Sequence, residues 1–179
     1  MMITKSLSLE ELAFVVCKVL KDNGVDAVLT GGAVVAIYSD NLYMSYDLDF
    51  VTHSSLKEID NILKRIGFVR KGRSFFHSET DYYLDFPAPP LSVGDKPVDT
   101  FNEITKKNGY LKLLTPTHCV MDRLASYYYW DDNQALTQAV MVSSKQKINL
   151  VEIKEWSENE GMSDKYAGYV KELKKYSGI

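Results

Sequence analysis

The sequence predicts an α/β protein of the α+β kind, in which helices flank a small mixed β-sheet and a helical region follows. Three observations lead to this fold class. Helix start signals alternate with short apolar runs as far as Gly67, short β-prone segments follow to Phe86, and the pattern beyond Thr115 is helical. The chain has 179 residues, of which 45% are hydrophobic and 25% charged, a composition typical of one main globular domain.

The first elements are marked by a capping box and by glycines. The capping box that begins at Ser8 opens an amphipathic helix, which we expect to end near Gly24. Residues 25–30 form a short apolar run, which predicts a buried strand that leads into a turn at Gly31-Gly32. Residues 33–38 then predict a short helix.

The middle of the chain predicts further strands around one helix. Residues 46–52 read as a strand, and a capping box that begins at Ser55 opens a helix through residue 66. A β-meander is predicted for residues 68–70, 74–77 and 82–86. Residues 98–107 predict a turn or short helix, and residues 110–114 predict another strand.

From Thr115 onward the sequence predicts helices. Thr115 is a candidate N-cap, and Pro116 suits the first helical position. The predicted helices are residues 117–129, 133–142, 149–160 and 163–176. We therefore expect an α/β core over residues 1–114 and a helical C-terminal region over residues 115–179 that packs on the core.

Charge and composition exclude several classes of protein. The net charge of −3 argues against a broad basic surface for nucleic acid. The densest basic cluster is interpreted as a solvated face, with a local nucleic-acid patch as the alternative. It comprises Lys64, Arg65, Arg70, Lys71 and Arg73. Cys17 and Cys119 lie in separate apolar runs, which predicts two buried free thiols. No segment has the pattern of a signal peptide or a membrane span, so we expect a cytoplasmic protein without a membrane partner.

Paired carboxylates form the strongest chemical signal. Asp47 and Asp49 are two residues apart on a predicted strand, so their side chains project from the same face. Two carboxylates on one face repel each other unless a cation lies between them, and a pair of divalent ions held by oxygen ligands can catalyse phosphoryl transfer. Asp85, the single charge in the strand-like run 82–86, is a candidate third acid.

The glycine pair is a candidate phosphate site. Gly31 and Gly32 stand between a predicted strand and a predicted helix, where backbone N–H groups approach an anion closely and the helix dipole favours negative charge. The alternative is a tight turn without a ligand.

Taken together, Gly31-Gly32, Asp47-Leu48-Asp49-Phe50 and Leu84-Asp85-Phe86 resemble the signature of the nucleotidyltransferase superfamily. The surrounding sequence is similar to the small prokaryotic branch that includes the AbiEii-type toxins. The resemblance covers roughly the first half of the chain. It implies a fold with a small mixed sheet, a nucleoside triphosphate (NTP) substrate and two Mg²⁺ ions.

The resemblance also implies roles for individual residues. Asp47, Asp49 and Asp85 would be the metal ligands and catalytic acids, and Asp85 would lie near the acceptor and assist its deprotonation. Gly31 and Gly32 would hold the β- and γ-phosphates. Ser45 would also belong to the nucleotide-binding site, since it fits a serine or threonine position of the family two places before the first acid.

Arg123 is a further candidate for phosphate binding, because it is a permanent cation on an otherwise apolar predicted helix. An ion pair with Asp122 is the alternative interpretation.

The predicted function is transfer of a nucleoside monophosphate to a hydroxyl group on RNA, protein or a small molecule. The expected partners are an NTP and an acceptor such as tRNA or protein, with an antitoxin or a second copy of the chain as further candidates. The competing hypothesis is a non-catalytic binding or adaptor protein with the same fold.

Overall fold

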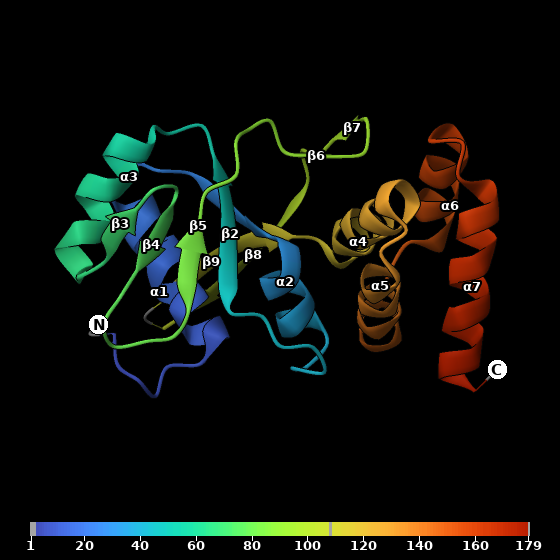
Figure 1. Cartoon of the computed structure of the whole chain (residues 1–179), viewed down its shortest axis with the longest axis horizontal. Helices are drawn as coiled ribbons and strands as arrows, with labels where there is room; N and C mark the ends of the chain where they lie inside the picture. Colours follow the sequence, from blue (N-terminus) through green and yellow to red (C-terminus); the bar gives the residue numbers. More distant parts are fainter. Residues whose placement is uncertain (1–2, 108, 179) are drawn as a thin grey trace. The chain divides into compact units, whose positions relative to one another are not determined.

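A computed structural model describes residues 3–107 and 109–178 (Figure 1). The chain has a mixed α/β fold and divides into two compact units. The first unit comprises Met1–Val34, Met44–Leu91 and Phe101–Leu113. The second comprises Val35–Tyr43, Ser92–Thr100 and Leu114–Ile179.

A mixed seven-stranded sheet organises the first unit. Its strand order is β3-β4-β5-β2-β1-β9-β8. In that order the strands span Val69–Lys71, Ser74–Phe76, Tyr83–Asp85, Asp47–Thr52, Ala27–Thr30, Gly109–Leu114 and Phe101–Lys106. Strand β2 is antiparallel to β1 and parallel to β5, and β4 is antiparallel to both β3 and β5. The predicted fold class is therefore confirmed.

Two helices of the first unit begin at the predicted capping residues. In α1 (Leu9–Asp22), the Ser8 hydroxyl accepts a bond from the Glu11 N–H, and the Glu11 carboxylate accepts one from the Ser8 N–H. In α3 (Leu56–Leu63), Ser55 caps the first turn, and a short 3₁₀ turn, η1 (Lys64–Ile66), follows it. These side chains satisfy N–H groups that would otherwise lack partners at the start of a helix.

Apolar side chains from one face of the sheet form the core of this unit. Leu48, Phe50, Phe75 and Leu84 are completely buried, and so are Leu12, Leu20, Ile59 and Leu63 of α1 and α3. Strand residues alternate between the two faces, so burial of this set directs the residues between them to the opposite face. The acids Asp47, Asp49 and Asp85 are on that opposite face, each partly exposed.

Four helices and a small hairpin build the second unit. The helices are α4 (Pro116–Trp130), α5 (Asn133–Lys145), α6 (Leu150–Asn159) and α7 (Ser163–Ser177). The hairpin pairs β6 (Ser92–Val93) with β7 (Lys96–Pro97). Thr115 caps α4 and Pro116 follows it, as predicted.

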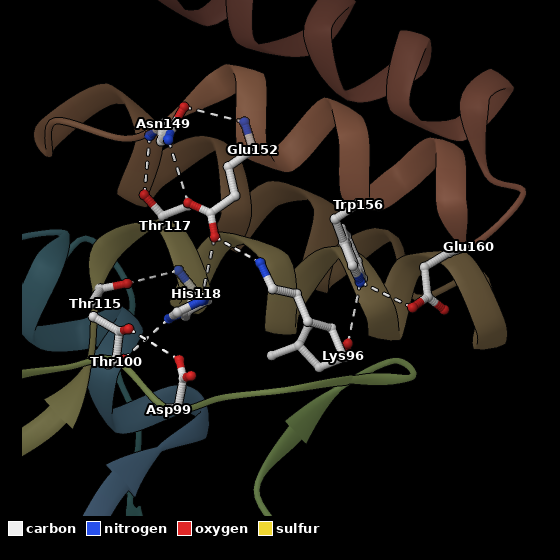
Figure 2. Close-up of polar contacts among 11 residues, drawn as sticks. Lys96, Asp99, Thr100, Thr115, Thr117, His118, Asn149, Glu152, Trp156 and Glu160 are labelled. Atoms are coloured by element: carbon white, nitrogen blue, oxygen red, sulfur yellow. Dashed lines mark hydrogen bonds and ion pairs between the residues drawn. The ribbon is translucent and has the colours of Figure 1, made fainter.

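Polar contacts join the hairpin segment to α4 and α6 (Figure 2). His118 Nδ1 lies 3.2 Å from the Thr100 carbonyl, and its Nε2 lies 3.6 Å from Glu152 Oε1. Lys96 Nζ is 2.8 Å from the same oxygen of Glu152. Trp156 stacks on Tyr128 and donates from its indole N–H to the Val93 carbonyl.

Three element predictions were wrong in detail. Residues 98–107 were expected to turn or form a helix, but β8 occupies Phe101–Lys106, because a sheet neighbour supplies its hydrogen bonds. Helix α5 continues past the break predicted at Ser143-Ser144 as far as Lys145. Both serine hydroxyls bond to carbonyls of the preceding turn, so they are satisfied without ending the helix. Helix α2 (Gly31–Tyr38) begins at Gly31 itself, without a separate turn.

Over the part of the chain that the structure describes, no helix is long and apolar enough to span a membrane.

Candidate active site

Strand pairing in the first unit brings the three acids onto one face. Asp49 of β2 and Asp85 of β5 are Cα partners on parallel neighbouring strands, so their side chains project from the same face. Asp47 is two residues before Asp49, and its Cα partner is Tyr83. Residues far apart in sequence thus form one acidic face at the centre of the sheet.

Ser45 and Gly31 position two of these carboxylates. The Ser45 hydroxyl, which is buried, donates to Asp47 Oδ1 at 2.6 Å, a distance typical of a bond to a charged acceptor. The Asp49 carboxylate lies directly over Gly31, where a Cβ atom would approach Asp49 Oδ2 to 2.5 Å. Gly31 also has φ +68°, a conformation that side-chain-bearing residues rarely adopt. The glycine is therefore required both by the backbone and by the acid above it.

Asp85 has an unsatisfied oxygen. Its Oδ1 is buried and has no hydrogen-bond partner among the described residues. A buried carboxylate oxygen without a donor is unfavourable, and a cation or a donor from a ligand would satisfy it. Negative charge is concentrated around it: the carboxylate of Asp47, burial, and then the carboxylates of Asp85 and Asp49 raise the pKa of Tyr83.

A cavity of about 440 Å³ lies beside two of the acids. Its lining residues are Asp49, Arg73, Ser74, Asp85, Phe86, Pro87 and Ala88. Arg73 is exposed and lies in this lining with Asp49 and Asp85. The sequence pattern places Arg73 in a basic cluster and does not identify it as a site residue. Its position beside Asp49 and Asp85 results from the pairing of β4 with β5, which the sequence pattern does not specify.

The chemistry of these acids fits a divalent cation. Mg²⁺ prefers carboxylate oxygens, and the unsatisfied Asp85 oxygen offers one. Across residues 3–107 and 109–178, however, no group of three or more His, Cys, Asp or Glu side chains is gathered closely enough to hold a metal ion. The bond from Ser45 holds Asp47 in its present orientation.

The other predicted site residues, Gly32 and Arg123, are on helices. Gly32 is in the first turn of α2, directly after Gly31. Arg123 is on α4 in the second unit, where its guanidinium is 2.6 Å from Asp122 Oδ2 and donates to Gln138. The ion pair that was the alternative interpretation of Arg123 is thus present, and its contact with a phosphate stays a prediction.

Two solved structures are similar to this chain. One is an antigenic nucleotidyltransferase-like protein from Paracoccidioides brasiliensis, with a TM-score of 0.54 and 15% identity over 78% of this chain and 77% of that one. The other is the antibiotic-resistance factor ANT(2'')-Ia, with a TM-score of 0.49 and 11% identity over 90% of this chain and 92% of that one. No protein-family model matches the chain, and no curated protein matches it.

The similarity to the Paracoccidioides structure shows the fold. This chain has a nucleotidyltransferase-like fold, as the glycine pair and the three acids predicted. Its activity and substrates do not follow from the fold alone, because one fold supports many functions.

Proposed function

We propose that the protein is a metal-dependent nucleotidyltransferase that moves a nucleoside monophosphate from an NTP to a hydroxyl acceptor and releases pyrophosphate. The observation that carries this proposal is the register of β2 and β5, which aligns Asp49 with Asp85 and places Asp47 on the same face. The buried, unsatisfied oxygen of Asp85 supports it, because this oxygen lacks a partner that substrate or metal would provide.

The roles of the residues follow from their positions. Asp47, Asp49 and Asp85 would hold two Mg²⁺ ions, which neutralise phosphate charge and favour ionisation of the acceptor hydroxyl when bound. Ser45 orients Asp47 through its hydroxyl, and its contact with the nucleotide stays a prediction. Gly31 and Gly32 offer N–H groups to the β- and γ-phosphates at the start of α2, where the helix dipole favours anions.

The reaction is an in-line substitution at the α-phosphorus. The acceptor oxygen forms a bond to the α-phosphorus while the bond to the bridging oxygen of the β-phosphate breaks, and pyrophosphate leaves with the electron pair. Asp85 accepts the proton of the attacking hydroxyl. Positioning and charge neutralisation account for most of the rate in this class of reaction.

Titration calorimetry with each NTP, with and without Mg²⁺, tests this proposal. The wild type should bind at least one NTP in the presence of metal, and an Asp47→Asn, Asp49→Asn double variant should lose that binding. Asp81→Asn is the control, because Asp81 is an exposed acid that precedes β5 and does not belong to the lining of the cavity beside Asp49 and Asp85.

A transfer assay completes the test. With an NTP labelled at the α-phosphate, the double variant should lose at least about 100-fold in turnover, as expected when charge stabilisation at the reacting phosphate is removed. Metal-dependent turnover that survives in the double variant would rule out the proposed site. Absence of NTP binding in the wild type would favour the adaptor hypothesis. Assignment to the AbiEii-type branch, with an antitoxin partner, stays a prediction.

A further inference from the structure

The acidic face extends outward to the edge of the sheet along two rows of cross-strand partners. One row contains Asp49, Asp85, Ser74 and Lys71. The second row contains Asp47, Tyr83, Phe76 and Val69. Cross-strand partners share a face, so all these side chains project from the side of the sheet that carries the acids. The rows end on β3, two strand spacings or about 10 Å from β5.

An aromatic pair occupies the second row. The rings of Phe76 and Tyr83 are stacked, with centroids 5.5 Å apart and planes at 23°. Phe76 is 38% exposed, and Lys71 Nζ lies 5.4 Å from the centroid of its ring. Tyr83 is also partly exposed, and its neighbour in the row is the acid Asp47. Flat apolar surface is therefore presented to solvent beside the candidate active site.

The same part of the chain is strongly basic. Residues 61–78 contain five cations and no acid. Lys71 projects from the face that carries the acids, and Arg73 lines the cavity beside them. Arg70, the Cα partner of the buried Phe75, projects from the opposite face, and Arg65 bonds to Asn23 at the end of α1. Lysine and arginine on β3 also protect an exposed sheet edge from pairing with another strand. Edge protection does not account for the stacked Phe76–Tyr83 pair, nor for Arg73, which lines the cavity with Asp49 and Asp85.

We infer that the β3–β4 hairpin and the Phe76–Tyr83 pair bind the terminal nucleotides of a single-stranded nucleic acid, which is the acceptor of the proposed reaction. The inference rests on the proposed function and names its acceptor class. Bases stack on the aromatic pair, and Lys71 and Arg73 neutralise the backbone phosphates. The two rows lead from this surface to Asp85, so the terminal hydroxyl approaches the acid that accepts its proton. A polycationic small molecule would be repelled by the hairpin.

Fluorescence anisotropy with labelled 12-nucleotide single-stranded RNA and DNA, without NTP or metal, tests the inference. The wild type should bind RNA or DNA, and Phe76→Ala should weaken binding at least about fivefold by loss of stacking. Phe76→Trp keeps an aromatic ring and should retain binding. This variant distinguishes loss of base stacking from an effect of substitution on folding. Trp130→Ala is the matched control, because Trp130 is an exposed aromatic residue on α4, 75% exposed.

Salt dependence provides the second readout. Lys71→Gln should lower the slope of log affinity against log salt by about 0.7, the value for one phosphate contact to a single strand. Lys57→Gln, an exposed lysine on α3, should leave the slope unchanged. No binding by the wild type, or equal losses in Phe76→Ala and Trp130→Ala, would overturn the inference. If heparin competes with RNA and DNA equally well and Phe76→Ala binds as the wild type does, the surface binds polyanions in general. That outcome would also overturn the inference. Because this assay omits NTP, its failure is distinct from failure of metal-dependent NTP binding.

Discussion

At the scale of single residues, the candidate site is organised by contacts between neighbours rather than by the acids alone. Ser45 donates to Asp47, and Gly31 leaves space for Asp49. The sequence predicted all four residues as site residues, because glycine turns and paired acids are local patterns. It did not predict that Ser45 bonds to an acid, since that depends on how the chain turns into β2.

Replacement of Gly31 by alanine tests this arrangement. Gly31→Ala adds a Cβ atom 2.5 Å from Asp49 Oδ2 at a residue with φ +68°, so the carboxylate must move. We expect at least about tenfold lower turnover, because an ångström-scale displacement of a catalytic group has effects of this size or larger.

Gly24→Ala is the control that separates backbone strain at a positive φ from the steric clash with Asp49. Gly24 has φ +82°, but nothing lies within 4 Å of its added Cβ atom. Both variants should lose about 1 kcal/mol of unfolding free energy through the positive φ. If Gly31→Ala and Gly24→Ala reduce turnover equally, the role of Gly31 as the space beneath Asp49 is wrong.

At the scale of elements, local signals predicted helices well and strand pairing poorly. Helices α1, α3 and α4 begin after Ser8, Ser55 and Thr115, because a cap and its helix are close in sequence. Strand β8 was missed, since its bonds come from a neighbouring strand. Arg73 was not recognised as a site residue for the same reason: β4 must pair with β5 before it lies beside Asp85.

His118 links three elements of the second unit, as Figure 2 shows. The residue is 6% exposed, and its ring contacts Thr100 from the segment before β8 and Glu152 from α6. His118→Ala leaves the Thr100 carbonyl without this donor and creates a cavity, which should lower the unfolding free energy by about 2–3 kcal/mol. Urea denaturation measures the change.

The control for this variant is His53→Ala. His53 is exposed just after β2, so its replacement should change the unfolding free energy by less than about 0.5 kcal/mol. Similar values for the two variants would show that the contacts of His118 do not stabilise the second unit.

At the scale of the whole molecule, burial determines the pKa and the reactivity of the two thiols. Cys17 and Cys119 are both free and buried, as the sequence predicted from their apolar surroundings. Burial is the main cause that raises the pKa of Cys17 from 9.0 to about 11, and it also raises the pKa of Cys119. Both thiols should therefore be unreactive in the folded protein near neutral pH.

The raised pKa of Cys17 predicts a loss of stability in alkali. Below pH 9 the thiol is protonated in both the folded and the unfolded states. Between pH 9 and pH 11 the unfolded chain loses this proton first, so the unfolding free energy falls with rising pH. The loss is on the order of 2 kcal/mol.

Urea denaturation at pH 8, 9, 10 and 11 checks this, with Cys17→Ala as the comparison. Cys17→Ala is less stable at pH 8 but should show a shallower decline, because the titrating group is absent. Parallel pH profiles for the two proteins would contradict the assignment.

Strand β3 carries a further consequence for the behaviour of the protein at high concentration. It is an outer strand of the sheet, it is exposed along its whole length, and it carries Arg70 and Lys71 next to the exposed Val69. Mutual repulsion of these cations opposes strand addition between two copies of the chain. Salt screening or bound polyanion would weaken that repulsion, so the upper limit of monodisperse concentration should fall as ionic strength rises.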